Sequence, residues 1–190
     1  MAITQPPAIG YASALADEAS AGHRDPSEWF SRARALKRAS DRLHAAAEAH
    51  RCWIDNAMRQ ERGDNSEYVR ELRRDASYDG DAVFLMAGLA VEAMLKGLWL
   101  ASNAGSDPDE FDRLGHEQMA LAEGALVPLT PTERQLCTFL TEFITSVRRV
   151  PSAARVDDAG TPIIGADTYA QFRAFYHRLS NVVATRNAYA

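Results

Sequence analysis

The most apolar stretch of the chain runs from Asp81 to Ala101 and is hydrophobic on nearly every side of the helix that it predicts. Only Glu92 and Lys96 interrupt it, one helical turn apart. A helix of about 20 residues is about 30 Å long, which is enough to span a membrane. Each charge, however, costs roughly 2.5 to 3.5 kcal/mol at the centre of an inserted helix. The pattern therefore predicts the central helix of a soluble helical domain, at about residues 82–101, with an ion pair in its interior.

The segment before it has the pattern of a long amphipathic helix. Asp25, Pro26 and Glu28 combine an N-cap, a proline at the first helical position and a glutamate in the first turn. The spacing of the inward residues predicts a helix of up to about ten turns that ends near residues 62–65. These residues recur at alternating spacings of four and three: Trp29, Ala33, Leu36, Ser40, Leu43, Ala47, His50 and Ile54.

Glycine, proline and capping residues divide the rest of the chain into further helices. A shorter helical piece is predicted from Ser66 to about Gly80, where a break separates it from the central helix. Capped starts at residues 107–110 and 130–133 predict a short helix and a longer one. Between them, another short helix is predicted to end at Gly124.

The last two predicted helices each have one apolar face, and a loop over residues 152–166 separates them. The first face consists of Leu136, Phe139, Leu140, Phe143, Ile144 and Val147. The second, in a helix that begins at Asp167, consists of Tyr169, Phe172, Tyr176, Leu179 and Val183. The sequence has no internal repeat and no strand-like alternation longer than a few residues. The predicted fold class is therefore all-α, a single helical bundle over residues 25–190 after a tail over residues 1–24.

Composition and charge change this picture little. With 190 residues the chain is long enough for one domain with a well-formed core, and its formal net charge is −5. That charge gives no overall attraction to nucleic acid or to an anionic membrane. Residues 1–10 lack the basic and apolar regions of a signal peptide, so we expect a cytoplasmic protein. Cys52 and Cys137 are expected to be reduced and partly buried.

No pattern in the sequence indicates a cofactor or a metal. There is no glycine-rich phosphate loop, and the two cysteines lack the spacing of zinc ligands. His116 and Glu117 begin like a zinc-protease helix, but Ala120 stands where the second histidine is needed. We therefore expect no cofactor and no metal site.

Glu92 and Lys96 are the most informative polar residues because they interrupt the predicted core. Glutamate four residues before lysine is the favourable orientation for a helical ion pair. Burial of such a pair requires further partners that offset the lost hydration. The candidates are His116 and either Arg148 or Arg149. Two interpretations stay open: a structural cluster that fixes how the helices pack, or a small-ligand pocket formed by Glu92, Lys96, His116 and Arg149.

The order of these residues resembles the HEPN superfamily over roughly residues 26–185. The chain has Ala87-Gly88-x-x-x-Glu92-x-x-Leu95-Lys96, then Gly115-His116-Glu117, then Arg149-Val150-Pro151. These segments are similar to the family's A-G-x-x-x-E-x-x-L-K, H-D-L and R-Y-P motifs. Glu117 and Gln118 replace the Asp-Leu pair, and Val150 replaces the tyrosine.

The resemblance implies a bundle of four or more helices that often forms a homodimer. Such proteins are often encoded beside nucleotidyltransferases or in toxin–antitoxin and defence systems. On this basis we expect a HEPN-like helical module that acts by dimerisation or by binding a protein partner. A nucleotidyltransferase-type antitoxin is one such partner, and the implied setting is bacterial toxin–antitoxin, defence or stress response.

Many HEPN proteins are metal-independent endoribonucleases, which gives the alternative function, with RNA as substrate. In their signature an arginine precedes a histidine by four to six intervening residues. Arginine stabilises charge on the scissile phosphate, while histidine moves the 2′-hydroxyl proton. Arg38 and His44 have this spacing, but chance produces such a match in a chain this rich in arginine. Arg173 and His177 have three residues between them and share one face of the last helix. The catalytic candidates are His116, Arg149, Arg173 and His177.

A basic cluster lies on the first long helix. It consists of Arg32, Arg34, Lys37, Arg38 and Arg42. Such a run is usually a solvated face, and the alternative is a surface that contacts RNA phosphates or an acidic partner. For that surface the candidates are Arg34, Lys37 and Arg38. Packing, rather than base stacking, is expected of the three tryptophans, Trp29, Trp53 and Trp99.

Overall fold

The computed structural model describes residues 25–60, 67–104, 108–146 and 166–188. All regular structure in these ranges is helical, which confirms the predicted all-α bundle. The helices are α2 (Pro26–Gln60), α3 (Glu67–Ser102), α4 (Pro108–Leu114), α5 (Gln118–Gly124), α6 (Pro131–Ser146) and α7 (Ala166–Ala188). The predicted tail over residues 1–24, the loop over 152–165 and the candidates Arg148 and Arg149 lie outside the described residues.

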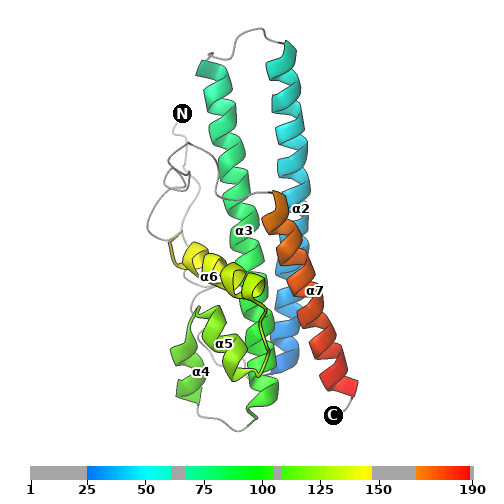
Figure 1. Cartoon of the computed structure of the whole chain (residues 1–190), viewed down its shortest axis with the longest axis vertical. Helices are drawn as coiled ribbons and strands as arrows, with labels where there is room; N and C mark the ends of the chain where they lie inside the picture. Colours follow the sequence, from blue (N-terminus) through cyan, green and yellow to red (C-terminus); the bar gives the residue numbers. More distant parts are fainter. Residues whose placement is uncertain (1–24, 61–66, 105–107, 147–165, 189–190) are drawn as a thin grey trace, which may run out of the picture.

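Helices α2 and α3 form a long antiparallel hairpin, the most extensive helix pair in the described part of the chain (Figure 1). Helix α7 packs across one side of this hairpin, and α4, α5 and α6 lie along the other side of α3 (Figure 1). The two long helices approach closely at Gly97, where an added Cβ would lie 2.5 Å from Cε1 of Phe30. The absence of a side chain at Gly97 therefore sets the spacing of the hairpin.

The capping residues predicted at the starts of α2 and α6 form the expected hydrogen bonds. Asp25 caps α2, since one of its carboxylate oxygens accepts the backbone N–H of Ser27 at 2.8 Å. Thr130 and Glu133 form a capping box before α6. The Glu133 carboxylate accepts the N–H of Thr130 at 2.8 Å, and the Thr130 hydroxyl accepts the N–H of Glu133 at 3.3 Å.

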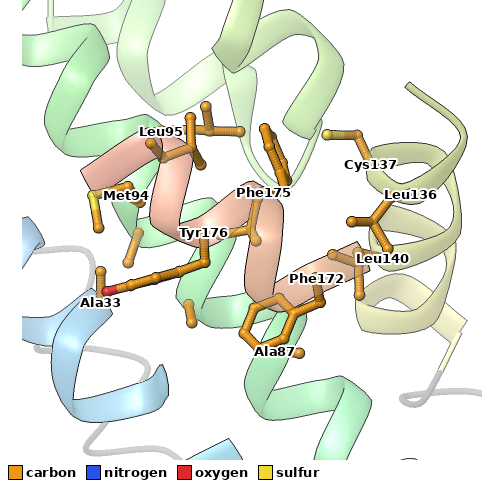
Figure 2. Packing of buried hydrophobic residues seen from close by; sticks show 14 of the residues in the cluster. Ala33, Ala87, Met94, Leu95, Leu136, Cys137, Leu140, Phe172, Phe175 and Tyr176 are labelled. Atoms are coloured by element: carbon orange, nitrogen blue, oxygen red, sulfur yellow. The ribbon is translucent and has the colours of Figure 1, made fainter. Parts of the chain in front are cut away.

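The core is formed by α3 with one face each of α2, α5, α6 and α7, and Figure 2 shows part of it. Most of the apolar residues predicted on one face of α6 and of α7 are buried, which confirms the two faces. These residues are Leu136, Leu140, Phe143, Ile144, Tyr169, Phe172, Tyr176 and Leu179. Phe139 and Val183 are only partly buried, and Phe175 is a buried residue that the pattern did not single out. Val147 lies outside the described residues.

The predicted break at Gly80 is wrong, because α3 runs without interruption from Glu67 to Ser102. A glycine in a helix interior costs only about 1 kcal/mol relative to alanine. The packing of α3 along α2 offsets that cost, and Gly80 keeps helical geometry. The central helix predicted at 82–101 is thus the second half of a longer one.

Three expectations of burial on α2 are also wrong. Leu43, predicted to face inward, is 37% exposed. Trp53 is 50% exposed and Cys52 is exposed, because neither lies on the inward face of α2 that contains Ala47 and Ile54. Trp29 and Trp99, at the other end of the hairpin, are buried as expected, and so is Cys137. Burial raises the pKa of the Cys137 thiol to about 12, which keeps it protonated.

The segment Gly80–Ser102 is long and apolar enough to cross a membrane, with a mean hydropathy of 1.7. Within the bundle, 72% of its most apolar 18-residue window is buried by the surrounding chain. That burial is what the core helix of a bundle shows. The cytoplasmic location remains a prediction.

Candidate functional site

The ion pair predicted inside α3 is present. The Nζ atom of Lys96 lies 2.8 Å from Oε1 of Glu92, and the two side chains are 13% and 7% exposed. They stand one turn apart on the flank of α3 nearest the α4–α5 connection. Because water reaches so little of either group, their charges must be satisfied by the protein itself.

His116 supplies the second partner of Glu92. Its Nδ1 lies 2.8 Å from Oε2 of the carboxylate, so each carboxylate oxygen has its own partner. The histidine lies in the turn between α4 and α5, where the Thr141 hydroxyl of α6 donates to its carbonyl oxygen. Of the predicted cluster, Glu92, Lys96 and His116 are brought together, and Arg149 lies outside the described residues.

Lys96 also faces two aromatic rings. Its Nζ atom lies 5.1 Å from the ring centre of Trp29 and 5.7 Å from that of Phe111. Both distances lie in the range of cation–π attraction. The ammonium group is therefore held by a carboxylate and two ring faces, which compensates its removal from water.

The pKa of Glu92 shows the balance of these effects. Burial alone raises the pKa of this carboxyl, but the His116 hydrogen bond and the Lys96 charge outweigh it, so the pKa lies below its ordinary value. Glu92 is thus a carboxylate at neutral pH. Chemically, the cluster can orient and polarise the His116 ring, whose side chain is 39% exposed. Its closed set of contacts equally fits a structural role.

A second group of predicted residues meets on the opposite side of the hairpin. Arg173 and His177 are exposed on α7 and line an open hollow of about 500 Å³. Lys37 of α2 lines the same hollow, although it is 136 positions away from Arg173 in the sequence. The remaining lining residues are Ala170, Ala174, Tyr176 and Ser180. His116 is not among them, so the structure pairs Arg173 with His177 rather than with His116.

The other two residues of the predicted phosphate-contact surface lie beside this hollow. Arg34 and Arg38 are exposed on α2, one turn before and just after Lys37. Their charges act on the phenol of Tyr176, where burial is the stronger influence and raises the pKa to about 12. The predicted basic cluster of α2 and the predicted arginine–histidine pair of α7 therefore form one surface.

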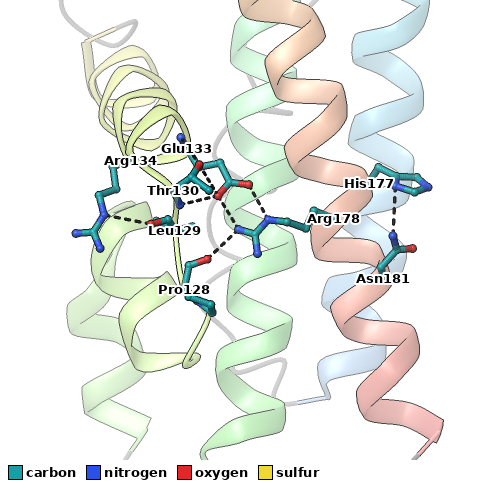
Figure 3. A network of polar contacts seen from close by, with 8 residues as sticks. All are labelled: Pro128, Leu129, Thr130, Glu133, Arg134, His177, Arg178 and Asn181. Carbon is teal, nitrogen blue, oxygen red and sulfur yellow. Dashed lines mark hydrogen bonds and ion pairs between the residues drawn. The ribbon is translucent and has the colours of Figure 1, made fainter.

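Arg178 fixes the rotation of α7 that turns Arg173 and His177 outward. Its guanidinium binds the Glu133 carboxylate of α6 through Nε at 2.6 Å and Nη2 at 2.9 Å, and also donates to the carbonyl of Pro128 (Figure 3). Figure 3 also shows His177 on the far side of α7, where its Nδ1 lies 3.4 Å from Nδ2 of Asn181.

A polar network beneath the hollow was not anticipated from the sequence. The Tyr169 hydroxyl donates to Asp41 at 2.9 Å, and Lys37 pairs with the same carboxylate at 2.6 Å. Ser40, fully buried, donates to the carbonyl of Val83 and so ties α2 to α3. His44 stacks on the Tyr169 ring with 3.8 Å between ring centres. His44 thus packs as part of the α2–α7 contact and does not line the hollow.

Within the described ranges, no group of three or more histidine, cysteine, aspartate or glutamate side chains is arranged to hold a metal ion. No protein-family model, curated protein or solved structure matches this chain. The HEPN resemblance therefore remains an expectation from the sequence. The features of the described residues that bear on function are the two polar groups and the exposed surface of the hairpin.

Proposed function

We propose that this chain is a HEPN-like helical module that acts by associating with a second copy of itself through the outer face of α2. One observation carries the proposal. A row of residues at spacings of four, three, four and three follows that face: Ala39, Leu43, Ala46, His50 and Trp53. Leu43 is 37% and Trp53 50% exposed. This is the spacing by which helices pair, and large apolar side chains gathered on one exposed face mark an interaction surface.

The row is complementary to itself when two copies run antiparallel. A twofold axis at Ala46 sets Trp53 of one copy opposite Ala39 of the other, and Leu43 opposite Ala49. The two large apolar side chains thus each meet an alanine, which allows the helices to approach closely there, while His50 lies opposite Arg42. Arg38 and Arg42 flank the row, so an acidic protein partner, such as a nucleotidyltransferase-type antitoxin in a toxin–antitoxin or defence setting, is the alternative occupant.

Sedimentation velocity tests the self-association. We expect the wild type to approach twice the 20.9 kDa chain mass, 41.8 kDa, as concentration rises. Trp53→Ala should weaken the dimer at least about tenfold, because a buried interface tryptophan typically contributes 2 kcal/mol or more. Leu126→Ala is the matched control, since Leu126 is 77% exposed in the turn after α5.

A wild type that stays monomeric, or a Leu126→Ala variant that dissociates as readily as Trp53→Ala, would contradict self-association through α2. A monomer that instead binds a co-encoded nucleotidyltransferase through Trp53 would support the partner alternative. Helical melting of each variant, followed by circular dichroism, establishes that the substitution has not unfolded the protein.

The hollow between α2 and α7 favours a second candidate, a metal-independent endoribonuclease. Arg173 and His177 lie one turn apart on its wall, where the arginine can contact a phosphate and the histidine a nearby hydroxyl. With labelled total RNA, His177→Ala should lower cleavage by about 10² or more. His116→Ala should retain cleavage, because His116 does not line the hollow. Intact RNA with the wild type rejects this candidate, and loss of cleavage in His116→Ala alone moves it to the Glu92 cluster.

A further inference from the structure

Three of the seven residues that line the α2–α7 hollow have basic side chains, in a chain of net charge −5. Lys37, Arg173 and His177 line it, and Arg34 and Arg38 stand beside it. The acidic group that faces it from α2 is Asp41, which is already engaged by Lys37 and by the Tyr169 hydroxyl. The local balance of charge therefore favours an anion.

Tyr176 provides an independent observation. Its side chain lines the hollow and is 5% exposed, and its ring crosses from α7 toward Ala33 of α2 (Figure 2). The hydroxyl is buried and has no hydrogen-bond partner among the described residues. With a pKa of about 12 it stays protonated at neutral pH and is a donor in need of an acceptor.

We propose that this hollow binds a phosphate group, with Lys37, Arg173 and His177 around it, and that the buried Tyr176 hydroxyl becomes accessible on binding and donates to the phosphate. A phosphate supplies negative charge and several strong acceptor oxygens, which the exposed Arg173 guanidinium and the Tyr176 hydroxyl can bind. The guanidinium of Arg173 presents a planar fork that matches two such oxygens, whereas Lys37 acts as a point charge. This inference builds on the phosphate contact of Arg173 in the ribonuclease candidate, but binding itself requires neither self-association nor cleavage.

The phosphate can belong to a small anion or to a nucleic-acid backbone, and two probes distinguish these sources. One is inorganic phosphate, titrated by calorimetry at constant ionic strength. The other is a fluorescent ten-nucleotide 2′-O-methyl RNA, followed by anisotropy. Because 2′-O-methyl RNA lacks the hydroxyl that a ribonuclease would activate, it reports binding even if the ribonuclease candidate fails. Tight RNA binding that inorganic phosphate displaces assigns the site to a nucleic-acid backbone. Binding of inorganic phosphate with no gain from the RNA assigns it to a small anion.

Three variants locate the site. Arg173→Ala should weaken both probes about tenfold, which corresponds to 1.4 kcal/mol. Tyr176→Phe removes only the hydroxyl and keeps the ring, so it should weaken inorganic phosphate by about threefold, as expected for one neutral hydrogen bond. Arg59→Ala is the matched control, because it removes one arginine from α2 at about 33 Å along the helix from Lys37. It should change neither affinity by more than about twofold.

The proposal is overturned if the wild type binds neither probe at millimolar inorganic phosphate and micromolar RNA. It is also overturned if Arg59→Ala weakens RNA binding as much as Arg173→Ala, since the contact would then be diffuse and not at the hollow. If Tyr176→Phe and the wild type bind inorganic phosphate with equal affinity, the Tyr176 hydroxyl does not donate to the phosphate, and that part of the proposal is wrong. Each variant should melt like the wild type, and Arg173, exposed on α7, offers the substitution least able to disturb the core.

Discussion

Glu92 illustrates at the scale of one residue why a charge in the core of this bundle needs several partners. Its two carboxylate oxygens are used by Lys96 and by His116, each at 2.8 Å. Lys96 is in turn covered by the rings of Trp29 and Phe111. Removal of one member leaves the others buried with an unsatisfied charge. The free-energy cost of that charge is larger than the net stabilisation that the intact pair provides.

We therefore expect Glu92→Ala to lower the free energy of unfolding by about 2 to 4 kcal/mol, because Lys96 is left almost buried without its counter-ion. Urea unfolding followed by circular dichroism measures this. Glu142→Ala, at an exposed position of α6, is the control and should stay within about 0.5 kcal/mol of wild type. In the double variant Glu92→Leu/Lys96→Leu much of the loss should be recovered. A loss as small as that of the control would mean that Lys96 finds another partner.

The same carboxyl predicts a pH dependence with a definite sign. The pKa of Glu92 in the folded state is below its ordinary value of 4.5. Its contribution to stability is therefore complete above about pH 4.5 and is lost as the pH falls through the folded-state pKa. The difference in unfolding free energy between wild type and Glu92→Gln should accordingly shrink between pH 5 and pH 3. A difference that stays constant across this range would contradict an ionised Glu92.

At the scale of an element, α3 shows that two glycines in one helix have opposite roles. Gly97 faces Phe30, and an added Cβ would lie 2.5 Å from that ring. At Gly80, apart from the helix backbone around it, no atom of the described residues lies within 4 Å of the position that a Cβ would take. The first glycine is required by packing between helices, while the second only adds conformational freedom to the unfolded chain.

Gly80→Ala should therefore raise the free energy of unfolding by about 0.5 to 1 kcal/mol, as expected for alanine in an uninterrupted helix. Gly97→Ala should lower it by about 1 to 3 kcal/mol, because Phe30 or the backbone must move. Thermal melting of the two variants beside wild type gives both signs in one experiment. Destabilisation by Gly80→Ala would indicate that the helix breaks there after all.

At the scale of the whole molecule, the sequence predicted much of the fold, for identifiable reasons. Asp25 and the Thr130–Glu133 pair mark helix starts with local hydrogen bonds, which depend on residues only a few positions apart. The break predicted at Gly80 was wrong because glycine costs a helix only about 1 kcal/mol, and packing along a neighbouring helix can offset that cost. The periodic pattern also placed Leu43 on the inward face, but it is 37% exposed, because the width of the face that neighbouring helices cover depends on their packing.

The Glu92 cluster and the α2–α7 hollow also differ in how far the sequence predicts them. The Glu92–Lys96 pair follows from a spacing of four in one helix, and His116 from the scarcity of polar residues able to reach it. The α2–α7 hollow could not be predicted, although Lys37, Arg173 and His177 were each singled out. Their meeting depends on the packing angle of α7, which the contact of Arg178 with Glu133 sets.

The separation of these walls along the chain has a consequence for how the protein is made. Helices α2 and α3 follow each other directly and can pair as soon as residue 102 has left the ribosome, since contacts between neighbouring helices form fastest. Helix α7 begins only at Ala166. During synthesis the basic wall of α2 is thus displayed on a folded hairpin well before its counterpart exists. The hollow is completed in the last step of folding, when α7 docks.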